Sequence, residues 1–203
     1  MDAIERLGWD QLDRAALTLA RAFASDPMFI WMFPNSRGRA RSIGLLSRFQ
    51  LEFGLRYGHA TESNDGMATA VWIPPGGAMT MGRMVRCGLL TLPLRIGWRP
   101  VAKFIGAGER LGQFHTRYMR EPHWYLMVVG VDPEFQGRGL GSALVEEGLA
   151  RADQGGRACY LETIMEPNLA YYARYGFRVL GSAPIGADGP TGWALRREPR
   201  GLR

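Results

Sequence analysis

The spacing of hydrophobic residues changes several times along this chain, and each change predicts a different secondary-structure element. Apolar side chains recur every three to four positions in residues 10–24 and 39–56, which is typical of helices with one face on a core. The segment WYLMVVGV, residues 124–131, is apolar without a gap and predicts a buried strand. The same criteria predict strands at 59–61, 67–75, 158–164, 177–181 and 193–197, and helices at 101–119, 139–152 and 168–175.

Three glycines separate the strand at 124–131 from the helix that follows it: Gly137, Gly139 and Gly141. A glycine-rich turn between a strand and a helix directs unpaired backbone N–H groups, together with the helix dipole, at one point in space. Such a point binds phosphate groups. The alternative is an ordinary tight turn whose glycines only permit the backbone conformation, and the hexapeptide alone leaves both open.

Two well-known phosphate-binding loops differ from this segment. A Walker loop ends in Gly-Lys-Ser/Thr, whereas Gly139-Leu140-Gly141-Ser142 has no lysine. Gly137 and Gly139 agree with the dinucleotide fingerprint GxGxxG, but Ser142 replaces its last glycine. Too few residues follow for a full doubly wound sheet, which disfavours a nicotinamide oxidoreductase.

Composition predicts a globular protein of one domain, residues 1–203. The 25 basic residues, of which Lys103 is the one lysine, are scattered, which argues against a nucleic-acid-binding stripe. The two cysteines have no metal-ligand spacing. Neither a secretory signal nor a membrane-spanning segment is recognisable, so we expect a cytoplasmic location, with no nucleic-acid or membrane partner and no metal.

The chain resembles the GCN5-related N-acetyltransferases (GNAT) at several separated points. The motif Q-x-x-G-x-G of residues 136–141 follows VGVDPEF, and LETIMEPNLAYYARYGF follows at the spacing of that family, with its Y-x-x-x-G-F hallmark at residues 172–177. Within the family the chain looks most like the puromycin N-acetyltransferase type. The resemblance covers about the C-terminal half, whereas residues 76–117 do not obviously match. It therefore indicates a reaction class and leaves the acceptor unidentified.

The resemblance implies an α/β (mixed α+β) fold of one domain. Its central sheet is expected to be mixed and mostly antiparallel, with helices on both faces and a splayed parallel pair formed by the strands at 124–131 and 158–164. An acetyl-CoA-binding core would occupy about residues 122–197. The helical region 1–120 would shape the acceptor pocket, although residues 76–120 are equally interpretable as plain scaffold or an oligomer contact.

The resemblance also implies how acetyl-CoA would be held. The loop amides would bind its diphosphate, and the strand ending at Val129–Val131 would bind its pantetheine arm. Asn168, at the head of the later helix, matches the family as well. The expected cofactor-binding residues are Val129, Val131, Gln136, Gly137, Arg138, Gly139, Leu140, Gly141, Ser142 and Asn168.

Acetyl transfer to an amine needs a protonated leaving thiol and a neutral amine. By the resemblance, Tyr172 matches the family's general acid, and a phenol can serve as an acid because it keeps its proton at pH 7. The alternative is that Tyr172 only packs in the core. We assign packing to its neighbours Tyr171 and Tyr175. Glu162 is the candidate base because a carboxylate on an apolar strand is costly without a function, although an ion pair with an arginine would also explain it. Cys159 has apolar neighbours and no nearby histidine, which favours direct transfer over an acyl-enzyme.

The acceptor itself is the least determined part. Phe29, Trp31 and Phe33 lie in a bulky apolar run that would line a substrate pocket or pack in the core. We predict an N-acetyltransferase acting on a primary amine of a small molecule. The alternative is a non-catalytic acetyl-CoA-binding sensor or partner-binding module. Both a monomer and a homodimer are compatible with the sequence.

Overall fold

The computed structural model describes residues 4–201, in which seven strands form one sheet of order β1-β2-β3-β4-β5-β7-β6. The strand bounds are β1 Ile4–Arg6, β2 His59–Ser63, β3 Ala68–Ile73, β4 Trp124–Val131, β5 Cys159–Thr163, β6 Arg178–Pro184 and β7 Thr191–Arg197. Every neighbouring pair is antiparallel except β4 and β5, which are parallel. This confirms the predicted mixed sheet and its parallel pair.

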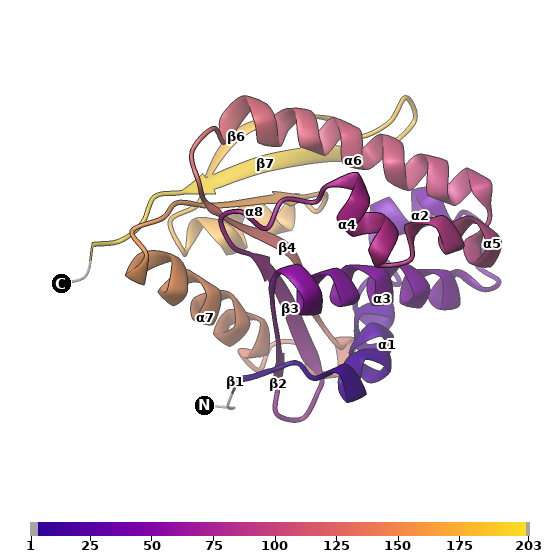
Figure 1. Ribbon diagram of the computed structural model, residues 1–203, viewed down its shortest axis with the longest axis horizontal. Coiled ribbons are helices and arrows are strands. Elements are labelled where there is room, and N and C mark those ends of the chain that lie inside the picture. Colours follow the sequence, from indigo (N-terminus) through magenta and orange to yellow (C-terminus); the bar gives the residue numbers. More distant parts are fainter. Residues whose placement is uncertain (1–3, 202–203) are drawn as a thin grey trace.

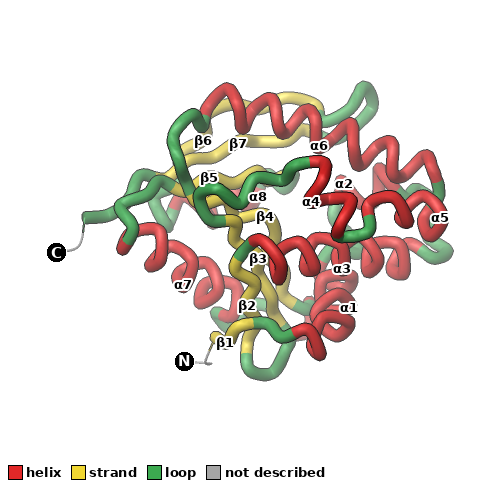
Figure 2. Tube along the Cα trace, in the orientation of Figure 1, coloured by secondary structure: helices red, strands yellow, loops and turns green. Residues whose placement is uncertain are grey.

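Helices cover both faces of the sheet (Figure 1). Their bounds are α1 Leu12–Ala22, α2 Pro27–Met32, α3 Arg39–Tyr57, α4 Met81–Arg86, α5 Leu92–Ile96, α6 Trp98–Tyr118, α7 Leu140–Gln154 and α8 Pro167–Ala173, with short 3-10 turns at Trp9–Gln11, Leu89–Thr91 and Pro133–Phe135. Helices α1 and α3 lie side by side on one face, and α6 runs over β7 on the same side (Figure 2). Helices α7 and α8 pack on the opposite face.

Glycines allow two helices to lie close against the sheet. A Cβ atom at Gly148 of α7 would lie 2.2 Å from the ring of Trp72, and one at Gly130 of β4 would lie 2.6 Å from Leu19 of α1. Both contacts are far shorter than a real Cβ tolerates, so a side chain at either position would push a helix outward. Helix α7 therefore lies directly against β3 at Trp72, and α1 lies directly against the end of β4 at Gly130.

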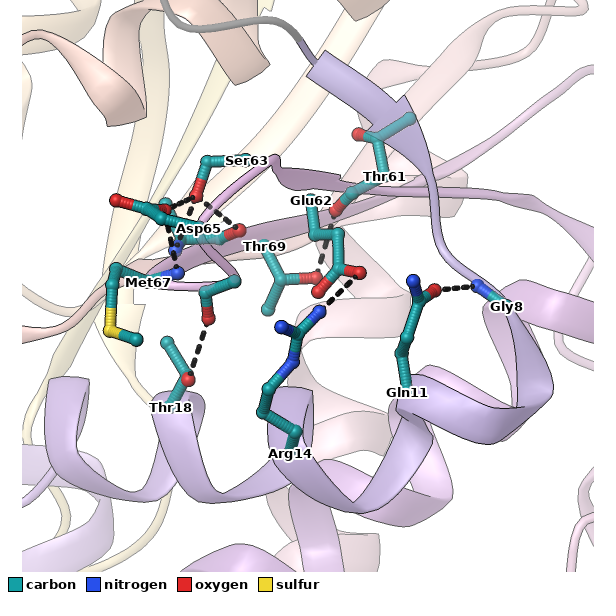
Figure 3. A network of polar contacts seen from close by, with 12 residues as sticks. Gly8, Gln11, Arg14, Thr18, Thr61, Glu62, Ser63, Asp65, Met67 and Thr69 are labelled. Carbon is teal, nitrogen blue, oxygen red and sulfur yellow. Dashed lines mark hydrogen bonds and ion pairs between the residues drawn. The ribbon is translucent and has the colours of Figure 1, made fainter.

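The β2–β3 hairpin, whose turn contains the Asp65-Gly66 pair typical of hairpins, contacts α1 through polar side chains (Figure 3). Arg14 donates to the buried carboxylate of Glu62 at 2.7 Å, and the Thr18 hydroxyl donates to the Gly66 carbonyl at 3.0 Å. Burial raises the pKa of Glu62, and the charge of Arg14 offsets part of that rise. These contacts fix α1 along the edge half of the sheet.

The parallel strands β4 and β5 separate after only three paired positions. Their register runs from Trp124 opposite Cys159 to Leu126 opposite Leu161, and β4 then continues to Val131 without a partner on that side. A bulge marks the point of separation. Val71 of β3 pairs with Val128 and Trp72 with Leu126, so one β4 residue is left unpaired between them. Bulges bend the strand that carries them, which is why β4 turns away from β5.

The sequence-based elements differ from the structure mainly in the middle and near the C-terminus. The helix predicted at 101–119 begins earlier, at Trp98, because Pro100 is tolerated in a first turn, where its missing N–H is not needed. The strands predicted at 177–181 and 193–197 are longer in the structure, where β6 extends to Pro184 and β7 begins at Thr191, so the glycine-rich loop expected at 182–192 is wrong at both ends. Ser182 pairs with Trp193 and Pro184 with Thr191, since β6 is an edge strand and such strands accept proline. Strand β1 was not predicted.

None of the helices within residues 4–201 is both long enough and apolar enough to cross a membrane.

Candidate active site

The loop between β4 and α7 presents a row of free backbone donors. None of the N–H groups of residues 137–142 donates a hydrogen bond within the described part of the chain, because the first bond of the helix is that of Ala143 to the Gly139 carbonyl at 3.0 Å. Gly137 and Gly139 have φ angles of 77° and 88°, which favour glycine, and a Cβ at either would meet nothing within 4 Å. The loop is thus an open cradle of donors at the dipole-positive end of a 15-residue helix.

An acidic residue that sequence analysis did not select holds this loop in place. Asp132, directly after β4, is buried and accepts a hydrogen bond from the N–H of Glu134 at 3.1 Å. Its carboxylate also pairs with Arg21 of α1, and its own N–H donates to the Met67 carbonyl at 2.8 Å. The D-P pair that ends the strand was the available signal, but only the fold shows the partner on α1.

The polar side chains of the loop face the backbone around them. Gln136 donates from Nε2 to the Val131 carbonyl at 3.2 Å. Arg138 lies over the Phe135 ring at 4.6 Å and is exposed. Among the other residues expected to bind the coenzyme, Leu140 is buried in the core, whereas Gly141 and Ser142 are half-buried at the start of α7. The backbone of this loop, more than its side chains, is therefore available for a ligand.

Val129 and Val131 lie on the part of β4 that has left β5. On the other side they pair with Ala70 and Ala68 of β3. Their backbone groups that point toward β5 have no strand partner in the described structure, as expected for a strand that binds an extended ligand. Asn168, in contrast, donates its amide to the Thr163 hydroxyl at 3.0 Å and so joins the end of β5 to the start of α8.

Tyr172 lies on α8, on the α7 side of the sheet. Its ring is buried and packs edge-on against Tyr171 and Phe177, with ring centroids 5.1 and 5.8 Å away. Its hydroxyl makes no hydrogen bond to any described residue, unlike the Tyr171 hydroxyl, which accepts from Tyr175 at 3.4 Å. Burial raises the pKa of Tyr172 above its ordinary value, so the phenol keeps its proton.

Tyr171 and Tyr175 were expected to serve packing alone. They do pack together, but the Tyr171 hydroxyl also lies beside the glycine-rich loop between β4 and α7, 3.5 Å from the position that a Cβ at Gly141 would take. From here an open cavity of about 480 Å³ extends along α7 and is lined by Ser142, Glu146, Leu149, Ala150, Asp153, Arg174, Tyr175, Arg197 and Arg200.

Glu162 lies on β5 one position beyond the last residue paired with β4. Its Oε2 atom is buried without a hydrogen-bond partner, while part of the residue remains accessible. Burial raises its pKa to about 7, and interactions with the Tyr125 and Tyr160 hydroxyls offset part of the rise. No arginine of the described chain forms an ion pair with it, so the predicted structural alternative is not present there. A carboxyl with this proton affinity can accept a proton near neutral pH.

Comparison with known proteins agrees with this geometry. The sequence model of the "Acetyltransferase (GNAT) family" matches residues 99–177. An uncharacterized N-acetyltransferase of Schizosaccharomyces pombe is 26% identical over 195 residues, which cover 86% of this chain and 74% of the relative. The chain is therefore similar to the GNAT family over residues 99–177 and to an N-acetyltransferase over most of its length.

Two further relatives extend the comparison. The mycothiol acetyltransferase of Actinosynnema mirum is 34% identical over 113 residues, 52% of this chain but 36% of that longer protein. A crystal structure from Corynebacterium glutamicum, described as "histone acetyltransferase HPA2 and related acetyltransferase", has a TM-score of 0.69, covers 100% of this chain and 99% of its own, and is 24% identical. This last likeness shows the fold.

Other residues that the sequence predicted for the site occupy different surroundings. Cys159 is fully buried, and burial raises its pKa to about 12, so it remains a thiol unsuited to nucleophilic attack. Phe29 and Phe33 are buried in the core, which supports the packing interpretation for both. Trp31 is half-buried, donates from its indole to Asp188 at 3.1 Å, and carries Lys103 over its ring at 4.5 Å. Trp31 thereby contacts the loop between β6 and β7.

Proposed function

We propose that this chain is a GNAT-type enzyme that moves the acetyl group of acetyl-CoA directly to a primary amine of a small molecule. The observation that carries the proposal is the separation of β4 from β5. Loop N–H groups without partners lie at the end of β4, and the Glu162 Oε2 atom, buried without a hydrogen-bond partner, lies beside the separation. A purely scaffolding sheet has no reason to leave these groups unsatisfied.

On the donor side, residues 137–142 would bind the coenzyme diphosphate through their N–H groups, and the open space at Gly137 and Gly139 is compatible with such a group. When bound, acetyl-CoA supplies an activated thioester. The backbone of Val129 and Val131 would hold the pantetheine arm and polarise the acetyl carbonyl. Tyr172 would then donate its proton to the departing sulfur.

On the acceptor side, Glu162 would take a proton from the ammonium form of the amine, which leaves the nitrogen lone pair free to attack. Its pKa of about 7 matches this task, since the ideal base has a pKa near the working pH. We place the acceptor under the N-terminal and middle helices of residues 1–120, with Trp31 as the candidate contact. Residues 122–197 would form the coenzyme-binding core of the single domain.

Support for a small-molecule acceptor comes from sequence. The motifs TAVWIPP, EPHWYLMVVGVDP and NLAYYARYGF resemble the puromycin N-acetyltransferase type, and one relative is named for its action on mycothiol. The fold likeness to a protein named as a histone acetyltransferase makes a protein amine the competing acceptor. Both cysteines are buried and unpaired, which suits the reducing cytoplasm that we propose as its location.

The test is a panel of amines, among them puromycin, arylalkylamines, amino sugars and a lysine-containing peptide, incubated with acetyl-CoA and followed by release of free thiol. We expect micromolar binding of acetyl-CoA by titration calorimetry and turnover of at least one small amine. Binding without turnover of any amine would favour the non-catalytic sensor. Turnover of the peptide alone would contradict a small-molecule acceptor.

A further inference from the structure

Two tyrosines face the candidate base on the α6 side of the sheet. Tyr125 of β4 and Tyr160 of β5 lie opposite each other in the parallel register, with ring centroids 5.9 Å apart. Glu162 follows Tyr160 by two positions, so both side chains project from the same face of β5. The pairing of the parallel strands therefore places two phenols next to the Glu162 carboxyl.

The Tyr160 hydroxyl is one of the few buried polar groups without a hydrogen-bond partner among residues 4–201, and Glu162 Oε2 is another. Tyr160 is completely buried. Buried polar atoms are almost always hydrogen-bonded, so two such groups on one face of one strand require an explanation. A donor and an acceptor that complete each other when Glu162 is ionised would explain both.

Both phenols remain donors over the whole accessible pH range. Burial, followed by the negative charge of Glu162, raises the pKa of Tyr160 and of Tyr125 well above its ordinary value. A protonated phenol can donate to a carboxylate, and a hydrogen bond to the charged form favours that form. The same contact would be weaker with the neutral acid, whose own proton competes for the space.

Two histidines on the α6 side pack against this tyrosine pair. The His115 ring of α6 lies 4.6 Å from the ring of Tyr160 and 5.1 Å from that of Tyr125. Its Nε2 is 2.5 Å from Nε2 of His123, whose Nδ1 lies 2.7 Å from the Glu121 carbonyl oxygen. Because a carbonyl only accepts, His123 carries its proton on Nδ1, and His115 donates from Nε2.

His115 stays neutral near neutral pH, since burial and the neighbouring His123 lower its pKa to about 4. It therefore adds no positive charge that would stabilise the Glu162 carboxylate.

The other charged or titratable groups on this face are engaged elsewhere. On β7, Ala194 lies opposite Glu162, and Arg196 lies opposite Tyr160. The Arg196 guanidinium pairs with Glu121 at 2.5 Å and with Glu198 at 2.7 Å. Tyr118 of α6 has its hydroxyl against the backbone of β6, 2.4 Å from where a Cβ of Gly181 would be. The two phenols are thus the groups left to influence Glu162 from this side.

We propose that Tyr125 and Tyr160 are positioning residues that donate hydrogen bonds to the Glu162 carboxylate and set the pH above which it accepts the amine proton. The inference rests on the proposed function of Glu162 as the base. Burial favours the neutral form of the carboxyl, and two phenol donors oppose that effect. The balance leaves a base that works near neutral pH inside an apolar sheet.

The test compares Tyr125→Phe and Tyr160→Phe with the unaltered protein in the pH dependence of kcat/KM for an accepted amine. Each change removes one donor and keeps the ring, so the rising limb should move to higher pH by about one pH unit, and the plateau at high pH should change less than about threefold. Tyr118→Phe, in the same cluster but directed at Gly181, is the matched control and should leave the limb in place.

A second measurement does not depend on catalysis. The Glu162 pKa can be measured by carboxyl ¹³C NMR titration of glutamate-labelled protein, with the signal assigned by its loss in Glu162→Gln. This pKa should be raised in both phenylalanine variants. If no amine is turned over, the proposed function fails, and this titration still decides the inference. A Glu162 pKa that is unchanged or lowered in both variants would overturn the inference. A lower kcat/KM plateau at high pH, with the rising limb at its original pH, would overturn it as well.

Discussion

The two sides of the gap between β4 and β5 are built in different ways. On the donor side, consecutive backbone groups of residues 137–142 converge at the start of α7, and one turn of chain provides the whole cradle. On the acceptor side, Tyr125, Tyr160, Glu162, His115 and His123 come from two strands, one helix and a connecting segment. Local backbone geometry makes the first side, whereas tertiary packing makes the second. The difference predicts that changes on the two sides will affect separate steps.

The largest effect is expected from Tyr172→Phe, which removes the proposed acid and keeps the packing against Phe177. We expect kcat to fall by ~10²–10⁴, with a smaller change in coenzyme affinity, because the hydroxyl acts as charge develops on sulfur. Steady-state kinetics and calorimetry separate the two quantities. Tyr57→Phe is the control, since that ring lies at the end of α3 beside Arg83. Near-normal kcat would assign the protonation of sulfur to another group.

The second effect concerns the acceptor side. Glu162→Gln should lower kcat/KM by about 10² near neutral pH and remove the limb that rises with pH around 7, because the amide cannot accept the amine proton. Acetyl-CoA affinity should stay within about twofold, which sharpens the separation of the two sides. Glu62→Gln, at a buried carboxylate paired with Arg14, is the matched control for the limb.

Glu162→Gln, which should lower activity, is expected to raise stability at high pH. A carboxyl whose pKa is raised in the folded state binds more protons there than in the unfolded state, so it lowers the free energy of unfolding as pH rises from about 4.5 to about 7. The free energy of unfolding of Glu162→Gln, taken relative to that of the unaltered protein, should therefore be higher at pH 8 than at pH 5. Urea unfolding at both pH values measures this, and a loss at pH 8 would mean that the carboxylate is stabilised by its surroundings.

A smaller effect is expected from Gly139→Asp on the donor side. A negative side chain in the cradle should weaken acetyl-CoA binding at least tenfold, or about 1.4 kcal/mol, by calorimetry. Gly156→Asp provides a closely matched control, since Gly156 also has a positive φ angle of 59° and open space around it, but lies beyond the far end of α7. Equal affinities for the two variants would place the diphosphate elsewhere.

The smallest effect should come from Asn168→Ala. Its amide bonds to Thr163, so its loss should cost about 1 kcal/mol of unfolding free energy, as is typical of one neutral hydrogen bond. Exposed Asn64, in the β2–β3 turn, serves as the control for stability. If acetyl-CoA affinity instead falls as far as in Gly139→Asp, Asn168 belongs with the coenzyme-binding residues.

Sequence reasoning succeeded where local rules decide the structure. The bounds of β4 at Trp124–Val131, the parallel partner at Cys159–Thr163 and the helix between them were all predictable. A gap-free apolar run indicates a buried strand, and glycines at positive φ mark the turn that follows. Edge elements were less predictable: β1 has three residues, and β6 extends through Pro184 because of its pairing with β7.

The sequence by itself therefore determined the fold class, the GNAT resemblance and the donor loop, since each depends on neighbouring residues or on spacing along the chain. Only the tertiary structure decided that Phe29 and Phe33 belong to the core, that Asp132 is held by Arg21, and that Glu162 faces two phenols beneath a histidine pair. These facts depend on burial and on contacts between residues far apart in sequence. Burial sets the proton affinity of a carboxyl, and no local pattern records which distant side chains will surround it.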